Sequence, residues 1–228
     1  MWNRKELKAK GKTAFKANYW KSVLSALLLS IAVGGAAFVT ANGADKDELS
    51  AQLGNLTDVQ IFAVLMIVLG VVATIVLVAA IIRIFLLNPL EVGCQRFFVE
   101  NSKNPAELSE LGFGFKNHYG NVVATILLRD VFLFLWSLLF VIPAIVKTYS
   151  YRMVPYIVAE NPDMKATDAI TLSRNMMKGH KWNAFVLDLS FIGWYLLSCL
   201  TLGLLAFFYV SPYHYATNAE LYGALKSK

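Results

Sequence analysis

Three long stretches of the chain contain no Asp, Glu, Lys or Arg, and they limit the fold more than any other feature. They cover residues 22–41, 59–82 and 189–219. A helix needs about 20 apolar residues to cross a bilayer, so each stretch is long enough. Only 16% of the 228 residues are charged, 57% are apolar and the mean hydropathy is +0.53. These values exclude a soluble enzyme, a disordered chain and a disulfide scaffold, and they predict an all-α polytopic membrane protein.

The N-terminal segment is strongly basic. Residues 1–21 hold seven Lys or Arg against one Glu, and the first apolar stretch follows directly. A cleaved signal peptide with small residues near Ala41 and Ala44 is one interpretation. The apolar run is longer than the about 7–15 residues of a signal peptide, however, so we favour an uncleaved first span. Leu7, Phe15 and Tyr19 recur at helical spacing among the lysines, which predicts an interfacial helix on the cytoplasmic face.

The distribution of Lys and Arg sets the predicted topology. The acidic, glycine-containing segment 42–58 is expected outside the cell. A helical hairpin turning at Ile142-Pro143-Ala144 places 16 of the 21 Lys and Arg in cytoplasmic segments, whereas one kinked helix would place residues 160–181 outside. The prediction is one membrane domain, residues 1–228, with six spans in three hairpins and both termini in the cytoplasm. The expected spans are about 22–41, 59–87, 119–142, 144–160, 182–201 and 203–224, with a tight turn near Leu202-Gly203 and a cytoplasmic surface helix at 162–179.

Small residues and prolines indicate how the helices pack. Ser22, Ala26, Ser30 and Gly34 recur every fourth residue, which predicts a smooth ridge for close packing inside the protein or between copies. Gly70 and Thr74 are a candidate groove for this ridge. The returning helix of each hairpin contains a proline, and a kink is expected at each one: Pro89, Pro155 and Pro212. The similar sequences VPYIVAEN and SPYHYATN leave a hairpin repeat as an alternative to coincidence.

Five charged residues lie inside the predicted spans. At 1.5 Å per residue they fall about 8–12 Å from the cytoplasmic ends of their helices, in one layer of the inner leaflet. Isolated charges at such depth are costly, so they should pair or face a wet cavity. The layer holds three arginines and two aspartates, one positive charge in excess: Arg83, Arg129, Asp130, Arg152 and Asp188.

Two interpretations of this layer stay open. A pocket for an anion such as a lipid phosphate would use the bidentate fork of arginine. An ion-pair network that only fixes the helix register is the alternative. Aromatic side chains that could line the same cavity, or form an interfacial belt, are Tyr149, Tyr151, Tyr156, Tyr195, Tyr209, Tyr213, Tyr215 and His214.

The chain carries no recognisable catalytic or metal-binding motif. No HExxH, G-x-S-x-G, Walker or G-x-G-x-x-G pattern occurs, and no histidine has a cysteine or glutamate at metal-ligand spacing. His214 and Glu220 are expected to make a polar contact, and Asp130 and Asp188 to be ionised and structural rather than a catalytic carboxylate pair. Cys94 and Cys199 are expected near opposite membrane faces, which excludes a disulfide between them. We therefore expect no enzymatic activity, no cofactor, no metal and no nucleic-acid partner.

Several blocks of the sequence resemble a known family. They are IPAIVKTYSYRMVPYIVAENPDMKATDAITLSRNMMKGHKW, LSFIGWYLLSCLTLG and SPYHYATNAELYGAL, with NYWKS and NPLEVG nearer the N-terminus. Together they are similar to the bacterial integral membrane family catalogued as domain of unknown function number nine-seven-five. Pro143-Ala144 stands where the family usually has Pro-Gly. The block from Ala159 to Gly179 is more faintly similar to the membrane domain of some glycerophosphodiester phosphodiesterases.

The resemblance implies a six-helix protein of the cytoplasmic membrane and supplies no activity or catalytic residue. Combined with the polar layer, it favours a non-enzymatic protein that binds or transports an amphiphile or anionic lipid at the inner leaflet. The alternative function is a membrane interaction or scaffold subunit, with a membrane-protein partner or a second copy of the chain.

Overall fold

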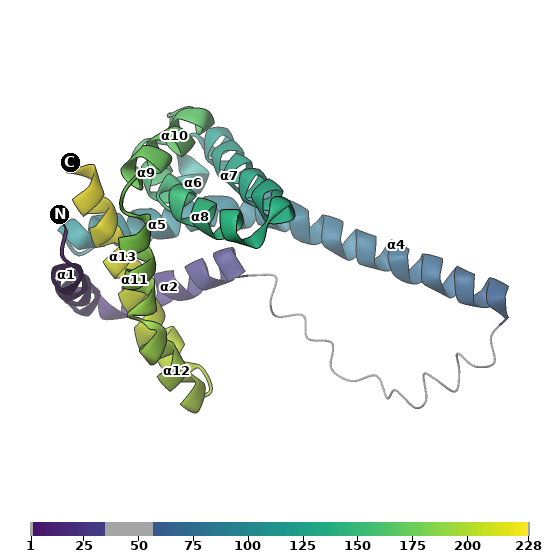
Figure 1. The fold of residues 1–228 in the computed structure, drawn as a ribbon, viewed down its shortest axis with the longest axis horizontal. Helices are drawn as coiled ribbons and strands as arrows, with labels where there is room; N and C mark the ends of the chain where they lie inside the picture. Colours follow the sequence, from purple (N-terminus) through teal and green to yellow (C-terminus); the bar gives the residue numbers. More distant parts are fainter. Residues whose placement is uncertain (1, 35–56, 228) are drawn as a thin grey trace.

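The structure, a computed structural model, describes residues 2–34 and 57–227, and every regular element in these two ranges is helical. This confirms the all-α prediction. Residues 35–56 lie outside the described ranges. They include the end of the predicted first span and most of the acidic segment that is expected outside the cell. A helical body contains both ends of the described chain, and α4 (Asp58–Ile82) projects from it (Figure 1).

The first helix packs on the protein instead of presenting its apolar face to lipid. α1 (Arg4–Ala17) begins at Asn3, whose Oδ1 accepts a hydrogen bond from Lys5 N at 3.0 Å. Its buried residues are Leu7, Gly11 and Phe15, and they lie on the side that meets α13 (Ser211–Lys226). A Cβ atom on Gly11 would lie 2.7 Å from Thr217 Oγ1, so this close approach requires glycine. The lysines of α1 lie on the opposite, exposed face, and the interfacial position of this helix stays a prediction.

The ridge of small residues is used inside the protein. α2 (Tyr19–Gly34) buries Ser22 and Ala26 completely and packs against α5 (Asn88–Lys103) and α13. The predicted groove on α4 does not receive it. A side chain added at Gly70 would meet nothing within 4 Å.

The segment after the second span is the centre of the molecule. The predicted second span ends at residue 87, but the helix continues into α5, which carries eleven buried residues and contacts most of the other body helices. Gly93 lies directly against the backbone of Leu111, in the short helix η2 (Leu108–Gly112) that leads into α6 (Phe113–Lys116). The prediction failed because Pro89 does not end the helix. A π-helical turn, η1 (Arg83–Leu87), shifts the hydrogen-bond register just before it and lets the helix continue.

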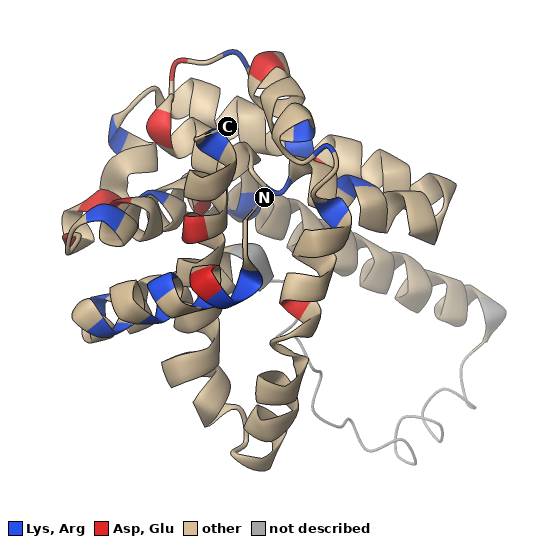
Figure 2. Cartoon of the chain, turned by 60° about the vertical axis from the view of Figure 1, so that its left-hand side comes forward, with Lys and Arg blue, Asp and Glu red and all other residues tan. Residues whose placement is uncertain are grey.

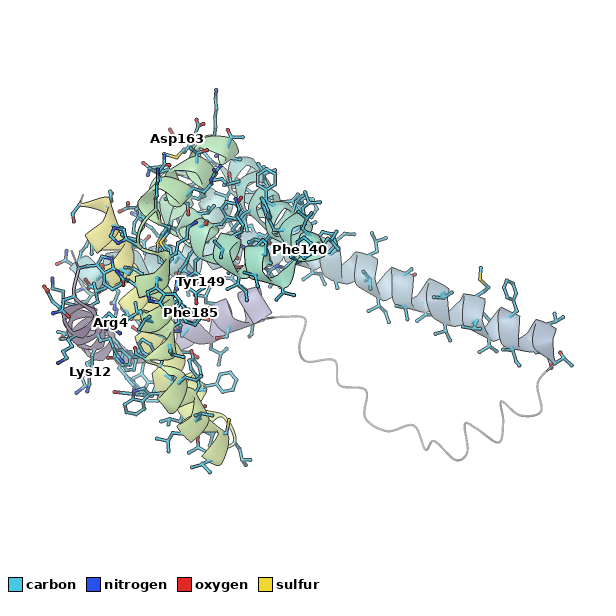
Figure 3. The ribbon with its side chains drawn as sticks, viewed as in Figure 1. Arg4, Lys12, Phe140, Tyr149, Asp163 and Phe185 are labelled. Atoms are coloured by element: carbon cyan, nitrogen blue, oxygen red, sulfur yellow. The ribbon has the colours of Figure 1, made fainter. Side chains whose placement is uncertain are left out.

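Two predicted hairpins are present. α7 (Tyr119–Leu139) and α8 (Val141–Tyr151) turn at Phe140, which is extended (φ −160°, ψ 150°), rather than at Ile142-Pro143-Ala144 (Figure 3). α11 (Lys181–Leu189) and α12 (Ile192–Leu200) lead to the other turn, where Leu202 and Gly203 adopt positive φ values of 50° and 84° as the tight-turn prediction requires. Between them, α9 (Val154–Glu160) is buried in the body and α10 (Ala166–Met176) lies over α7 and α9.

Each of the three prolines lies next to an irregular turn in a helical run. Pro212 follows a second π-helical turn, η3 (Ala206–Val210), as Pro89 follows η1, and each then opens a 16-residue helix. Pro155 opens α9 after a break at Arg152 and Met153. The similarity in structure is therefore between the helices at Pro89 and Pro212, whereas the sequence comparison had paired Pro155 with Pro212.

Three helical runs in the described ranges are long and apolar enough to cross a bilayer: Val59–Lys103, Tyr119–Leu139 and Lys181–Leu200. A shorter apolar helix covers Tyr19–Ala32. The six full-length spans are thus not established. The predicted arm 144–160 is divided between α8 and α9, and the arm 203–224 is helical through η3 and α13 but is not among the three runs. Charged residues gather on α1 and on the body, while the projecting helix α4 is uncharged from Val59 to Ile82 (Figure 2).

Candidate functional site

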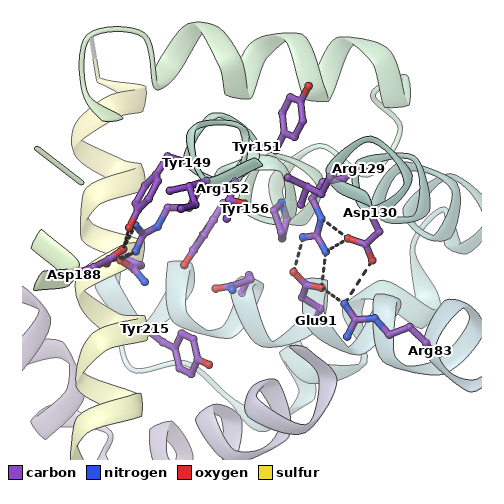
Figure 4. A pocket seen from close by; sticks show the side chains of 16 residues that line it. Arg83, Glu91, Arg129, Asp130, Tyr149, Tyr151, Arg152, Tyr156, Asp188 and Tyr215 are labelled. Atoms are coloured by element: carbon purple, nitrogen blue, oxygen red, sulfur yellow. Dashed lines mark hydrogen bonds and ion pairs between the residues drawn. The ribbon is translucent and has the colours of Figure 1, made fainter. Parts of the chain in front are cut away.

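All five charged residues of the predicted layer line one cavity of about 470 Å³ (Figure 4). It lies between helices from different parts of the chain: η1, α5, α7, α8, α9, α11 and α13. Two groups of hydrogen-bonded side chains flank it, one around Glu91 and one around Asp188. We call them the Glu91 cluster and the Asp188 cluster.

The Glu91 cluster comprises Arg83, Glu91, Arg129 and Asp130. Arg129 donates from Nη1 and Nη2 to the two carboxylate oxygens of Glu91, at 2.6 and 3.0 Å. It also donates from Nε and Nη2 to Oδ1 of Asp130, at 2.9 and 2.7 Å. The Arg129 and Glu91 side chains are only 9% and 5% exposed, so this bidentate pair is almost fully removed from solvent.

Arg83 is held much more loosely than Arg129. Its Nη2 lies 3.5 Å from Asp130 Oδ2 and 3.9 Å from Glu91 Oε2, and its side chain is 31% exposed. These distances are at or beyond the limit of a good charge-assisted hydrogen bond. Arg83 therefore retains donor groups that the protein does not use strongly.

Glu91 corrects the predicted charge of the layer. With it, three arginines face three carboxylates in the cavity lining, so the expected excess of one positive charge is wrong. The sequence did contain a signal, since Arg83 and Glu91 are the only charged residues between Val59 and Gln95. Asn88-Pro89 indicates a break, so the predicted second span ends at Leu87 and Glu91 lies outside the predicted spans.

The Asp188 cluster is organised around one carboxylate. Arg152 donates to both oxygens of Asp188 at 2.7 Å, and Tyr149 Oη donates at 2.9 Å. His214 Nε2 lies 3.0 Å from Asp188 Oδ1 and therefore carries a hydrogen, because an ionised carboxylate only accepts. Arg152 also donates to Asn218 Oδ1 at 2.7 Å. The carboxylate that His214 contacts is thus Asp188, not the predicted Glu220.

The aromatic residues singled out in the sequence divide into three groups. Those that line the cavity are Tyr149, Tyr151, Tyr156 and Tyr215. His214 lies behind Asp188, with Tyr195 Oη 3.3 Å from its Nδ1. Tyr209 and Tyr213 lie apart from the cavity lining and pack against aromatic rings of the core, Phe15 and Phe191 among them, at centroid distances of 5.8 and 5.1 Å.

Asp130 and Asp188 belong to different clusters on opposite sides of the cavity (Figure 4). They do not form a carboxylate pair, and each is already engaged by an arginine. Across residues 2–34 and 57–227, no group of three or more His, Cys, Asp or Glu side chains is arranged to hold a metal ion. Both cysteines are free, Cys94 buried and Cys199 exposed.

Gln95 also lines the cavity, and no sequence pattern marks it as a site residue. It lies on α5 one turn after Glu91, lines the cavity and is only 6% exposed. Its Oε1 is buried and has no hydrogen-bond partner in the described part of the chain. A buried polar atom of this kind costs about 1–3 kcal/mol when unpaired. The cavity thus combines two satisfied ion-pair clusters with an unsatisfied amide.

Comparison with known proteins gives a family but no activity. No curated protein and no solved structure matches the chain. The fainter similarity to the membrane domain of glycerophosphodiester phosphodiesterases stays a prediction. Residues 138–228 match the model of the family described as Protein of unknown function (DUF975), which confirms the predicted resemblance. The match covers 91 of the 228 residues and shows what this C-terminal part of the chain is similar to.

Proposed function

We propose that the protein binds the polar headgroup of a membrane amphiphile in the cavity between the Glu91 cluster and the Asp188 cluster. The unpartnered amide oxygen of Gln95 carries this proposal. A ligand that donates a hydrogen bond to Gln95 Oε1 recovers the cost of leaving that buried atom unpaired. The ion pairs alone would not require a ligand, since their partners already satisfy them.

The charges around the cavity favour a particular kind of headgroup. Because three arginines are balanced by three carboxylates, net charge gives a bare anion no advantage. Arg83 can still donate to an anionic oxygen, because its own contacts are long. A headgroup with a phosphate oxygen for Arg83 and a hydroxyl or ammonium donor for Gln95 fits both features. Such groups are found on phospholipids.

Apolar side chains of the lining suit the rest of an amphiphile. Leu133, Ile145 and Pro155 line the cavity beside the charged residues, and the first two belong to the arms of the α7–α8 hairpin. An acyl chain could follow these arms while the headgroup stays between the clusters. Transport would require release of the same ligand to the opposite leaflet, so binding is the part of the proposal that the cavity supports.

We further propose that the protein lies in the cytoplasmic membrane with both termini in the cytoplasm. The support is the exposed basic face of α1 and the charged surface of the body, compared with the uncharged α4 and α7–α8 tip. Lys and Arg are retained on the cytoplasmic side of membrane proteins. The two arms of a hairpin end on the same side of the membrane, whether its tip crosses the bilayer or turns within it.

The test compares two variants that each remove an unpartnered buried polar atom. Gln95→Leu lies in the cavity lining, and Thr125→Val replaces another buried oxygen outside it. Both are expected to leave stability unchanged or slightly raised. Native mass spectrometry after extraction in mild detergent should show at least a fivefold loss of retained phospholipid for Gln95→Leu only. Equal lipid retention in wild type and Gln95→Leu would refute the proposal.

An interaction subunit remains a second candidate function because of α4. Its apolar residues are exposed along its whole described length, and its most apolar part is not covered by any other part of the described chain. A helix with apolar residues on all sides is stable in lipid or packed against a partner helix. Gly70→Leu adds bulk where this chain makes no contact. Loss of a co-purifying membrane protein from this variant would favour the second function, and unchanged purification would favour lipid contact.

A further inference from the structure

The α7–α8 hairpin is too short to follow α4 across the membrane. Arg83 at the end of α4 contacts Asp130 in the middle of α7, so the reach of both helices can be measured from this contact. From that contact α4 extends 25 residues, about 37 Å, which exceeds the about 30 Å of a bilayer core. From Asp130 to the turn, α7 extends only about 14 Å. In Figure 3, Phe140 correspondingly ends the hairpin well short of the far end of α4.

The first half of α7 is not available to cross lipid. Its residues from Val122 to Arg129 include five that are buried in the body, and α10 packs on them. The amide of Asn121 donates to the carbonyl oxygens of Pro162 and Met164, both at 2.7 Å, in the polar segment that precedes α10. The 21-residue length of α7 therefore overstates the part that can enter a membrane.

Charged groups on neighbouring helices fix where the hairpin leaves the body. α10 and α11 both pack against α8, and Ser173 Oγ donates to the carbonyl oxygen of Ser150 at 2.9 Å. Lys147 on α8 lies within electrostatic range of Arg174 and Lys181. Charged groups such as the exposed Arg174 do not lie in hydrocarbon, so the membrane boundary is near the level of Lys147. Only Val141 to Val146, about 9 Å of α8, extends beyond it.

The tip itself is apolar, with no hydrophilic loop to place in water. Phe140, Val141 and Ile142 are 72%, 73% and 76% exposed, and no charged residue occurs from Val131 to Val146. A turn that emerged on the far side of a membrane would present these side chains to water. In hydrocarbon they are stabilised by about 25 cal/mol per Å² of apolar surface removed from water.

We propose that the α7–α8 hairpin is re-entrant: it enters the leaflet next to the body, turns at Phe140 near the bilayer midplane and returns. Its partner is the acyl-chain layer of that one leaflet. The Lys and Arg distribution favours a hairpin over a single kinked helix, and it is the same for a re-entrant and a spanning hairpin. The assignment to the cytoplasmic leaflet rests on the proposed orientation, but the half-depth of the turn does not.

Single cysteines at three positions test this in the full-length protein carrying Cys94→Ala and Cys199→Ser, which has no other thiol. Thr57→Cys marks the far end of α4, Asp163→Cys the polar segment before α10, and Phe140→Cys the turn; all three native residues are exposed. A membrane-impermeant maleimide is applied to intact cells and to inverted vesicles. Thr57→Cys should react only in cells and Asp163→Cys only in inverted vesicles. Phe140→Cys should react in neither, and only after denaturation.

Reaction of Phe140→Cys in intact cells, to the same extent as Thr57→Cys, would overturn the re-entrant hairpin. If the proposed orientation is wrong, Thr57→Cys and Asp163→Cys exchange sides while Phe140→Cys stays protected, so the two failures are distinguishable.

Depth is measured with a bimane fluorophore attached at Phe140→Cys in phosphatidylcholine nanodiscs. Lipids brominated near the ends of their acyl chains should quench it at least twice as strongly as lipids brominated near the carbonyl groups. Quenching by aqueous iodide instead would place the turn in water and refute the proposal, whichever way the labelling came out.

Discussion

The two clusters that flank the cavity compensate their buried charges with opposite arrangements of hydrogen-bond donors and acceptors. In the Glu91 cluster one buried guanidinium, Arg129, is shared between two carboxylates, Glu91 and Asp130. In the Asp188 cluster one carboxylate is shared between several donors, among them Arg152 and Tyr149. Burial differs as well, because Arg129 and Glu91 are 9% and 5% exposed, whereas Arg152 and Asp188 are 15% and 26% exposed.

This difference separates the structural part of the site from the part that can adapt to a ligand. A closed, dry pair loses most when one partner is removed, because the other charge stays buried without compensation. A partly exposed carboxylate with several donors loses less, since the remaining donors and solvent can adjust. We therefore expect the effects on stability to decrease from Arg129 to Asp188 to the outer members of both clusters.

Removal of Arg129 should give the largest effect. Arg129→Gln leaves Glu91 and Asp130 close together without the guanidinium, and we expect a loss of about 3–5 kcal/mol in the free energy of unfolding. Stability is measured by the midpoint of thermal unfolding in a fixed detergent. The double variant Glu91→Gln, Arg129→Gln removes both charges of the pair and should recover part of the loss. A double variant less stable than Arg129→Gln would contradict the closed-pair interpretation.

Removal of the central carboxylate of the second cluster should cost less. Asp188→Asn keeps the shape of the side chain and one oxygen acceptor, so we expect a loss of about 2 kcal/mol. Its remaining hydrogen bond to Arg152, and the bond from Arg152 to Asn218, limit the damage. Asp163→Asn, an exposed aspartate outside the cluster, is the control with no expected change. The comparison fails if Asp188→Asn is more damaging than Arg129→Gln.

The clusters also show how far the sequence could be interpreted. Depth along a helix was enough to group Arg83, Arg129, Asp130, Arg152 and Asp188 in one layer, because helical rise is fixed at about 1.5 Å per residue. The pairing within that layer was not predictable. It depends on the rotation of each helix about its axis, which is set by packing across the chain.

Glu91 and Gln95 were missed for a local reason. Asn88-Pro89 normally indicates a helix end, and only the π-helical turn at Arg83–Leu87 lets the helix continue into the body. The α7–α8 hairpin, in contrast, was predictable from charge alone. Its depth was not, because the Lys and Arg count is the same for a hairpin that crosses the bilayer and one that turns within it.

A donor at the edge of the Asp188 cluster should have a smaller effect than its centre. Tyr149→Phe removes one hydroxyl hydrogen bond to a carboxylate that keeps its bonds to Arg152 and His214, so we expect a loss of about 1 kcal/mol. Tyr209→Phe is the matched control, since Tyr209 contributes ring contacts to the core. If both variants melt at the wild-type temperature, Asp188 does not depend on its outer donors.

Arg83 should have the smallest effect on stability and a large effect on binding, which is what distinguishes a ligand-binding arginine from a purely structural one. Its ion pairs are 3.5 and 3.9 Å long and its side chain is 31% exposed, so Arg83→Gln should cost less than about 1 kcal/mol. Because the other two arginines of the cavity stay paired with Glu91 and Asp188, the cavity keeps its shape. Retained phospholipid should nevertheless fall several-fold in native mass spectra, while Arg174→Gln, an exposed arginine outside the cavity lining, retains the wild-type amount. If Arg83→Gln lost stability but kept its lipid, Arg83 would be a structural partner of Glu91 and Asp130. The cavity would then be an ion-pair network that fixes the helix register.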